Sequence, residues 1–221
     1  MTFDEYEKME QKRARKAAKK AAKESSTPPP SSPPPSSMPS AGSGQLMNQN
    51  GYYYFATNFT TDSTKPVITW IMENNLLPDS KRPDYLTLVI NSPGGNVHAC
   101  FALIDAMKTS AIPVRTMGLG LIASCGILTF MAGEKGHRTI TQNTSIMSHQ
   151  YSWGSVGKEH ELFGRMREYE LSSERMINHY KKCTGLSESK IRKFLLPETD
   201  VWLSSEEAVE YGIADKIVET Y

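Results

Sequence analysis

From residue 52 onward, the sequence alternates between short apolar runs and longer segments in which apolar residues recur every three or four positions. The run over 86–91 is almost continuously apolar, which is typical of a strand buried on both faces. Residues 96–109 place Val97, Phe101 and Ile104 on one side of a helix. The pattern predicts strands over 52–57, 86–91, 114–118, 138–140, 145–148 and 216–219, and helices over 64–75, 96–109, 124–131, 158–182, 186–194 and 204–211. Strands that alternate with helices indicate an α/β domain.

The first fifty residues have a different composition. Residues 2–24 are rich in Lys, Arg and Ala, with Thr2 as a possible N-cap, and they predict a charged helix with little apolar surface. Residues 25–44 hold seven of the 13 prolines, interleaved with serines, and predict an extended spacer. We therefore divide the chain into a charged N-terminal helix (1–24), a disordered Pro/Ser-rich linker (25–50) and one domain (51–221). The helix is read as a solvated tail, with an assembly or docking helix as the alternative.

Charge and cysteine content exclude several classes of protein. The net charge is +1, with +3 on residues 1–24 and −2 on the rest, which argues against a nucleic-acid groove in the domain. The three cysteines show no short repeated spacing, so reduced thiols are expected. No apolar run reaches the roughly 18 residues of a membrane span, and the N-terminus lacks the apolar stretch of a secretory signal. We expect a cytoplasmic protein that contacts neither membrane nor nucleic acid.

Candidate nucleophiles lie side by side after a Gly-rich segment. Ser124 follows residues 118–120 and precedes an apolar helix, where a serine is most often only a helix cap. Cys125, the next residue, is a rival thiol nucleophile. A Gly pair, Gly94 and Gly95, follows the buried run over 86–91. Such a pair can serve a plain turn with positive φ, or it can let a backbone N–H approach a reacting carbonyl.

A base and a carboxylate follow in the same chain order. His149 closes the predicted strand 145–148, a position where a lone histidine is usually structural. Asp200 lies in a short segment before a helix, where its charge could serve the helix start, and Glu198 is a conceivable substitute. Taken with Ser124 and the Gly pair, these residues supply the parts of a serine peptidase: nucleophile, base, orienting carboxylate and oxyanion site.

Two longer motifs carry a family resemblance. The runs Leu88-Val-Ile-Asn-Ser-Pro-Gly-Gly95 and Glu206-Glu-Ala-Val-Glu-Tyr-Gly-Ile-Ala-Asp215, with Asp200-Val-Trp-Leu-Ser, resemble the proteolytic subunit of the Clp protease from about residue 52 to 221. The resemblance implies a spiral of ββα units, the fold shared with crotonases, from which a handle helix protrudes. It also implies a nucleophile, a base and an orienting residue in Ser124, His149 and Asp200. The implied oxyanion donors are Gly95 and Cys125, and the implied substrate-binding residues are Gly94, Asn96, Val97, Gln150, Tyr151 and Gly154.

The resemblance also implies partners. It predicts an endopeptidase that cleaves unfolded polypeptides inside a homo-oligomer of stacked heptameric rings, fed by an AAA+ unfoldase. Neither a metal site nor a phosphate-binding loop is visible in the sequence, so we expect no cofactor, and an ATP-driven step would need a separate protein. Thr87 and Val89 stand where familiar members carry aromatic residues for the unfoldase, so docking of a standard unfoldase partner is an open question.

Three alternatives remain at this stage. One is a viral assembly or prohead-maturation protease of the same fold, in a divergent, phage-encoded branch that acts in the host cytoplasm. Another is a non-catalytic assembly subunit in which the Ser/His/Asp set is misaligned. The third is a crotonase-like acyl-CoA enzyme, which shares the fold and the oxyanion site but has no use for that set.

Overall fold

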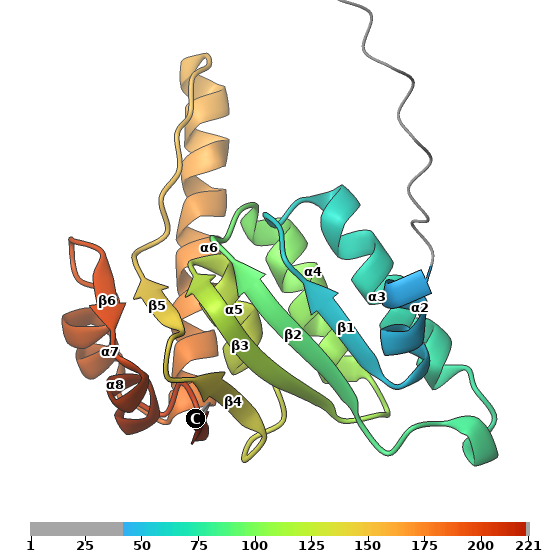
Figure 1. Ribbon diagram of the computed structural model, residues 1–221. Coiled ribbons are helices and arrows are strands. Elements are labelled where there is room, and N and C mark those ends of the chain that lie inside the picture. Colours follow the sequence, from blue (N-terminus) through green and yellow to red (C-terminus); the bar gives the residue numbers. More distant parts are fainter. Residues whose placement is uncertain (1–41, 220–221) are drawn as a thin grey trace, which may run out of the picture. The chain divides into compact units, whose positions relative to one another are not determined.

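A computed structural model describes residues 42–219 (Figure 1). In this part of the chain the strands are β1 (Tyr52–Phe55), β2 (Leu86–Ser92), β3 (Val114–Ala123), β4 (Arg138–Thr141), β5 (Ser145–Ser148), β6 (Val201–Leu203) and β7 (Lys216–Val218). The helices are α2 (Gly42–Gln49), α3 (Thr61–Asn75), η1 (Asp79–Lys81), α4 (Val97–Thr109), α5 (Cys125–Met131), α6 (Glu159–Thr184), α7 (Glu188–Phe194) and α8 (Ser205–Glu210). The predicted α/β class is confirmed.

One mixed sheet, mostly parallel, organises the described residues. Its main path is β1-β2-β3-β4-β7, and all of these pairs are parallel. Strand β5 pairs in parallel with the second half of β3, and β6 pairs antiparallel with β5. The sheet therefore branches at β3, whose first half pairs with β4 and whose second half pairs with β5.

Strand β3 is longer than the 114–118 strand that the sequence predicts. It runs on to Ala123 across Gly120, which adopts a positive φ of 66°. The register with β2 shifts there, and Asn91 Oδ1 accepts a hydrogen bond of 3.1 Å from the N–H of Leu121. A glycine at this irregularity lets the strand bend without ending, so residues that look like a loop in the sequence still pair with β5.

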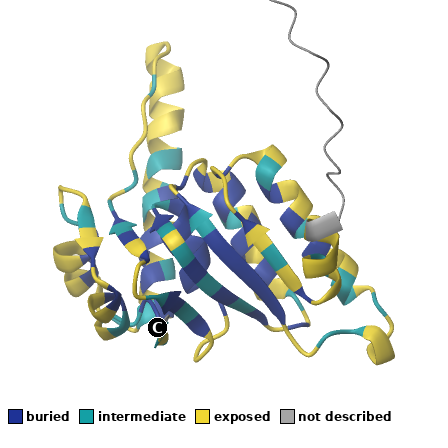
Figure 2. Cartoon of the chain, viewed as in Figure 1, coloured by how far each residue is buried: buried dark blue, intermediate teal, exposed yellow. Residues whose placement is uncertain are grey.

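The apolar core lies between the sheet and the helices α3, α4 and α5, which cover one of its faces (Figures 1 and 2). The alternate residues Leu86, Leu88 and Ile90 of β2 are completely buried, and so is Ile127 of α5. Every residue of β2 except the half-buried Asn91 is buried, which confirms the prediction of a strand enclosed on both faces.

Helix α6 protrudes from the domain, and this confirms the predicted handle helix (Figure 1). Its 26 residues correspond to a rod about 39 Å long. Its C-terminal half is anchored in the core through Met176, Ile177 and Tyr180, whereas its N-terminal half is exposed (Figure 2). The helix ends where Gly185 takes a left-handed conformation, with φ of 78°.

The predicted charged helix over 2–24 and most of the predicted linker lie outside the described residues. Residues 42–49, which we had placed in the linker, instead form helix α2. These residues contain no proline, and the indole Nε1 of Trp70 donates a 3.3 Å hydrogen bond to the carbonyl of Asn48. The helix stops before Gly51, whose φ is 77°. The predicted linker extends too far toward the C-terminus because it rests on composition alone, which does not reveal the contact between Trp70 and Asn48.

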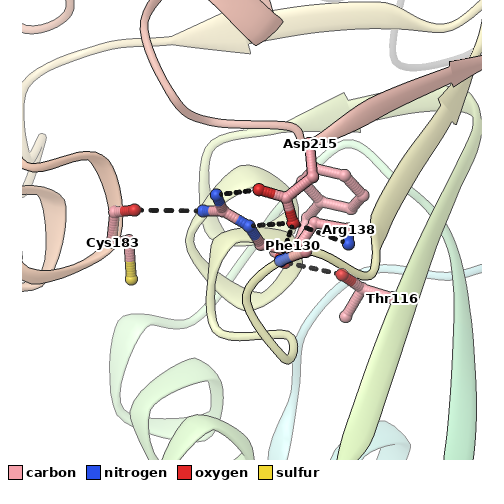
Figure 3. Close-up of polar contacts among 6 residues, drawn as sticks. Thr116, Phe130, Arg138, Cys183 and Asp215 are labelled. Carbon is pink, nitrogen blue, oxygen red and sulfur yellow. Dashed lines mark hydrogen bonds and ion pairs between the residues drawn. The ribbon is translucent and has the colours of Figure 1, made fainter.

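A buried ion pair ties the C-terminal strand to the sheet (Figure 3). The side chain of Arg138 is only 2% exposed, and its guanidinium donates to both carboxylate oxygens of Asp215, at 2.9 and 2.6 Å. It also donates to the carbonyl of Cys183 at the end of α6. The same carboxylate accepts from the backbone N–H groups of Gly136 and Arg138. One residue pair thus fastens β4, β7 and α6 together.

A half-buried histidine, His179 of α6, lies beside the core and can titrate. Its Nε2 lies 2.8 Å from the carbonyl oxygen of Leu128, to which it can only donate. Burial, aided by the charges of Lys108 and Lys182, lowers the pKa of His179 to about 4.

We therefore expect His179 to make the fold sensitive to mild acid. Between about pH 6.5 and 4 the unfolded chain binds a proton that the folded chain does not, so stability declines as the pH falls through this window, by at most about 3 kcal/mol. Urea unfolding from pH 7 to 4 would measure this decline. The control is His179→Gln, which keeps a donor for Leu128 but does not titrate. If both proteins lose stability equally over this range, the assignment to His179 is wrong.

Candidate active site

Neighbouring strands deliver the predicted residues to one place. Ser124 directly follows β3, and its N–H donates a 3.0 Å hydrogen bond to the carbonyl of Met147 in β5. His149 directly follows β5, two residues after Met147. In the antiparallel β5–β6 pair, Ser148 lies opposite Val201, so the next pair in that register would be His149 and Asp200. The branch of the sheet at β3 thus directs all three residues toward the same edge.

Ser124 has an unusual backbone. Its φ of 55° and ψ of −118° make it the one described residue other than glycine with a positive φ. Such a conformation typically costs about 1–3 kcal/mol and is concentrated at functional sites. Although Ser124 stands at the N-cap position of α5, its side chain makes no capping hydrogen bond. The simple helix-cap interpretation of this serine therefore does not hold, and its hydroxyl is free for another role.

A cavity of about 60 Å³ lies beside Ser124. Six more of the predicted site residues line it: Gly95, Val97, Cys125, His149, Gln150 and Tyr151. The rest of the lining consists of Leu128, Ser152, Met176 and Tyr180. Its walls combine apolar side chains, those of Val97, Leu128 and Met176, with polar groups, and such a mixed concave lining is typical of ligand sites.

The Gly pair that follows β2 packs closely against its neighbours, Gly94 against Ser124 and Gly95 against Phe59. A Cβ atom added to Gly94 would lie 2.6 Å from Cβ of Ser124, and one added to Gly95 would lie 2.5 Å from the carbonyl oxygen of Phe59. Both glycines have positive φ, 106° and 144°. Any side chain at either position would therefore clash, and only glycine permits this close approach.

Two backbone N–H groups beside Ser124 are left without partners. Phe59 donates to the carbonyl of Gly94 and accepts from the N–H of Asn96, both at 2.8 Å, so the Gly turn is held on either side. In the described part of the chain, the N–H of Gly95 and that of Cys125, the first residue of α5, make no hydrogen bond. Unpaired donors that flank a nucleophile are the arrangement that an oxyanion site requires.

The other predicted substrate residues differ in their placement. Asn96 caps α4 through a 2.9 Å bond from the N–H of Ala99 to its side-chain oxygen, and the side-chain amide of Gln150 donates to the carbonyl of Leu196. Gly154 lies in an exposed stretch and does not line the cavity. A structural role thus explains the side chain of Asn96 without a substrate.

Ser124, His149 and Asp200 do not form a hydrogen-bonded triad in this single chain. No hydrogen bond joins Ser124 to His149 or His149 to Asp200. Asp200 is exposed, as is the alternative carboxylate, Glu198. The fold brings Ser124 and His149 to one cavity, while Asp200 lies just before β6, beyond the last observed pair of the β5–β6 register.

Four residues of the cavity were not among the predicted site residues: Leu128, Ser152, Met176 and Tyr180. Leu128 lies one helical turn after Ser124, a signal that helix periodicity could have supplied. Met176 and Tyr180 share one face of α6, but nothing in the sequence tells that this face meets α5. Burial raises the pKa of Tyr180, and its hydroxyl pairs with that of Ser148 at 2.7 Å.

The thiol of Cys125 is engaged. It is buried and lies 3.2 Å from the carbonyl oxygen of Gly95, to which it can donate. We expect Cys125→Ser to retain most of the peptidase activity, because a hydroxyl can make the same bond. Cys125→Ala should lower kcat a few-fold, since a weak bond that steadies the Gly turn is lost. Peptide hydrolysis by purified variants would test this. A Cys125→Ser enzyme without activity, beside an active Ser124→Ala enzyme, would reverse the choice of nucleophile.

Comparison with known proteins identifies the family. A sequence model described as Clp protease matches residues 54–221. The chain belongs to the Clp protease family. It is 35% identical over 150 residues to an ATP-dependent Clp protease proteolytic subunit of Deinococcus radiodurans, with 67% of this chain and 72% of that protein covered. It is 37% identical over 138 residues to an ATP-dependent Clp protease proteolytic subunit 1 of Chlamydia muridarum, covering 62% and 71% respectively.

Membership in the Clp protease family confirms the predicted fold and the predicted activity, that of a serine endopeptidase. Proteins of this family form oligomeric rings and work with Clp ATPases. An acyl-CoA enzyme and a prohead-maturation protease are not better supported than this activity. Over residues 42–219, no helix is long and apolar enough to cross a membrane.

Proposed function

We propose that Ser124, His149 and Asp200 carry out peptide-bond hydrolysis by an acyl-enzyme mechanism. His149 takes the proton of the Ser124 hydroxyl as Oγ attacks the scissile carbonyl carbon. The N–H groups of Gly95 and Cys125 stabilise the resulting oxyanion. His149 then protonates the leaving amine as the C–N bond breaks. Water, deprotonated by His149, finally hydrolyses the ester and restores Ser124.

One observation carries this proposal: a strained serine with an unused hydroxyl stands between two unpaired backbone N–H groups. The strained backbone and the unpaired N–H groups do not stabilise the fold, because backbone strain opposes folding and a donor without a partner contributes no hydrogen bond. Both features are useful to a nucleophile whose carbonyl substrate becomes an oxyanion. The Asp200 assignment rests on the β5–β6 register, which makes this residue the nearest match to His149 in the pairing.

The test is covalent labelling with a fluorophosphonate, followed by mass analysis of the tagged peptide. We expect the tag on Ser124 and on no other serine. Labelling that is absent from an intact assembly both with and without an added unfoldase, or that falls elsewhere, would contradict the proposal.

The absence of hydrogen bonds among Ser124, His149 and Asp200 favours a second candidate function, that of a non-catalytic assembly subunit. In that case the isolated homo-oligomer would neither hydrolyse peptides nor take up the label. If an added unfoldase restored both hydrolysis and labelling, the protein would instead be an enzyme whose triad forms only in the complex with the unfoldase.

We further propose that the family's ring assembly takes the form of stacked heptamers in this chain and that the exposed half of α6 makes the contact between rings. Leu162, Phe163 and Met166 are exposed there, and Trp153 and Val156 are exposed on the adjoining segment, so a sizeable apolar surface lies open to water. A cytoplasmic location and recruitment of an AAA+ unfoldase complete the proposal. Unfolded polypeptides would be the substrates.

We expect the double variant Phe163→Glu/Met166→Glu to separate the rings, because charge on that surface opposes burial. Sedimentation velocity should show the mass of the assembly reduced by about half. Glu174→Gln, which changes charge on an exposed position farther along the same helix, serves as the control. A wild-type protein that sediments as a monomer at micromolar concentration with full activity would refute the ring assembly.

A further inference from the structure

A second, larger cavity lies away from Ser124, between α4, α6 and the turn from α5 to β4. Its volume is about 640 Å³. Phe101 and Ile104 of α4 and Met131 of α5 form apolar parts of its wall. A concave site of this size with a partly apolar wall is typical of small-molecule pockets. None of the residues that line the cavity beside Ser124 lines this one.

Three lysines from three separate elements line this cavity. Lys108 belongs to the last turn of α4, Lys182 to the last turn of α6, and Lys135 to the turn before β4. Within the described residues, none of the three makes an ion pair. The one carboxylate of the lining, Asp105, does not pair with any of them. Three exposed lysines thus border one cavity without an ion-pair partner among the described residues.

The guanidinium groups at the cavity are already occupied. Arg138 is held by Asp215 and by the carbonyl of Cys183, and Arg175 is held by Glu168. His179, also in the lining, is neutral, and the nearby lysines help to lower its pKa. The unsatisfied charge of the cavity is therefore carried by ammonium groups alone. Ammonium groups act as point charges and bind phosphate oxygens without the bidentate geometry that a guanidinium imposes.

We propose that this cavity binds a small phosphate-bearing anion. The three ammonium groups hold the phosphate oxygens, and the apolar wall formed by Phe101, Ile104 and Met131 accommodates any organic part of the ligand. Two sources share this chemistry, a free inorganic polyphosphate and a phosphate ester. The proposal is independent of the peptidase mechanism, since no residue assigned to catalysis lines the cavity.

Titration calorimetry of the full chain at fixed ionic strength tests the proposal, with inorganic pyrophosphate and ADP as matched probes. Each probe carries two phosphates. Tighter binding of ADP than of pyrophosphate would identify a phosphate ester as the ligand, and equal binding of the two would identify a free inorganic polyphosphate. We expect one site per chain for at least one probe. The triple variant Lys108→Gln/Lys135→Gln/Lys182→Gln should weaken binding at least tenfold, from about threefold for each exposed charge.

The control is Lys65→Gln/Lys81→Gln/Lys190→Gln, which removes the same charge from other surfaces. Equal binding by the two triple variants would mean that the probe responds only to net charge, and the site would be refuted. Absence of binding by both probes at millimolar concentration would refute it as well. Circular dichroism of both variants establishes that each is folded, and fluorophosphonate labelling of each reports separately on Ser124.

Discussion

Replacing Ser124 with alanine is expected to reduce peptide hydrolysis by at least about 10⁴-fold, which is the scale of loss when a nucleophile of this kind is removed. The fold should tolerate the change, because the hydroxyl makes no capping bond and alanine keeps the same backbone strain. Hydrolysis of a fluorogenic peptide, together with thermal unfolding of the same preparation, measures both quantities. Activity within tenfold of the parent enzyme would eliminate Ser124 as the nucleophile.

Two further variants locate the carboxylate. Asp200→Asn should reduce kcat by about 10⁴-fold, because an amide favours the wrong tautomer of His149. The matched control, Glu198→Gln, removes the other exposed carboxylate of the same loop and should leave kcat nearly unchanged. The opposite ranking would transfer the orienting role to Glu198.

Removing one partner of the Arg138–Asp215 pair should have the largest effect on stability. Asp215→Ala leaves a guanidinium that is 2% exposed without its carboxylate and deprives two backbone N–H groups of their acceptor. Losses of about 3–5 kcal/mol are typical when one partner of a buried pair is removed. The midpoint of urea unfolding would measure the change. As a control, Asp79→Ala removes a carboxylate that is 94% exposed and pairs with Arg82, and it should change stability by less than about 1 kcal/mol.

The same pair predicts a pH dependence. Burial raises the pKa of Asp215, but the hydrogen bonds from Arg138 outweigh burial and hold the pKa below its usual value. The folded state therefore gains stability from this carboxylate above about pH 4 and loses it as the pH falls through the lowered pKa. The difference between the parent protein and Asp215→Ala should narrow in that acidic range. A difference that stays constant down to pH 2 would show that charge plays no part.

Local patterns predicted most of the helices and strands of the described residues, and contacts between segments account for the differences. The run over 86–91 identified β2 because enclosure on both faces leaves a continuous apolar pattern. The end of β3 was missed because Gly120 reads as a break, although pairing with β5 carries the strand past it. Helix α2 was missed for a similar reason, since the bond from Trp70 to Asn48 joins residues 22 positions apart.

The candidate site was predictable in its residue types but not in its geometry. The order of Ser124, His149 and Asp200 along the chain points to the chemistry, yet only the pairing of β3 with β5 and of β5 with β6 determines which of these residues are neighbours. Asn96 illustrates the limit. An asparagine beside the Gly pair suits a substrate contact as well as a helix cap, and the hydrogen bond from Ala99 decides for the cap.

The strained backbone of Ser124 lowers the stability of the fold, while the hydroxyl that it carries is proposed to serve catalysis. Glycine alone adopts φ of 55° with ψ of −118° without steric strain, so Ser124→Gly should destroy activity and at the same time stabilise the protein by about 1–3 kcal/mol. Where proteolysis is not required, a change of Ser124 to glycine would therefore gain stability without a functional cost. We expect lineages that keep this fold only as an assembly component to drift toward glycine at position 124, so the residue found there would record how long selection for cleavage has lasted.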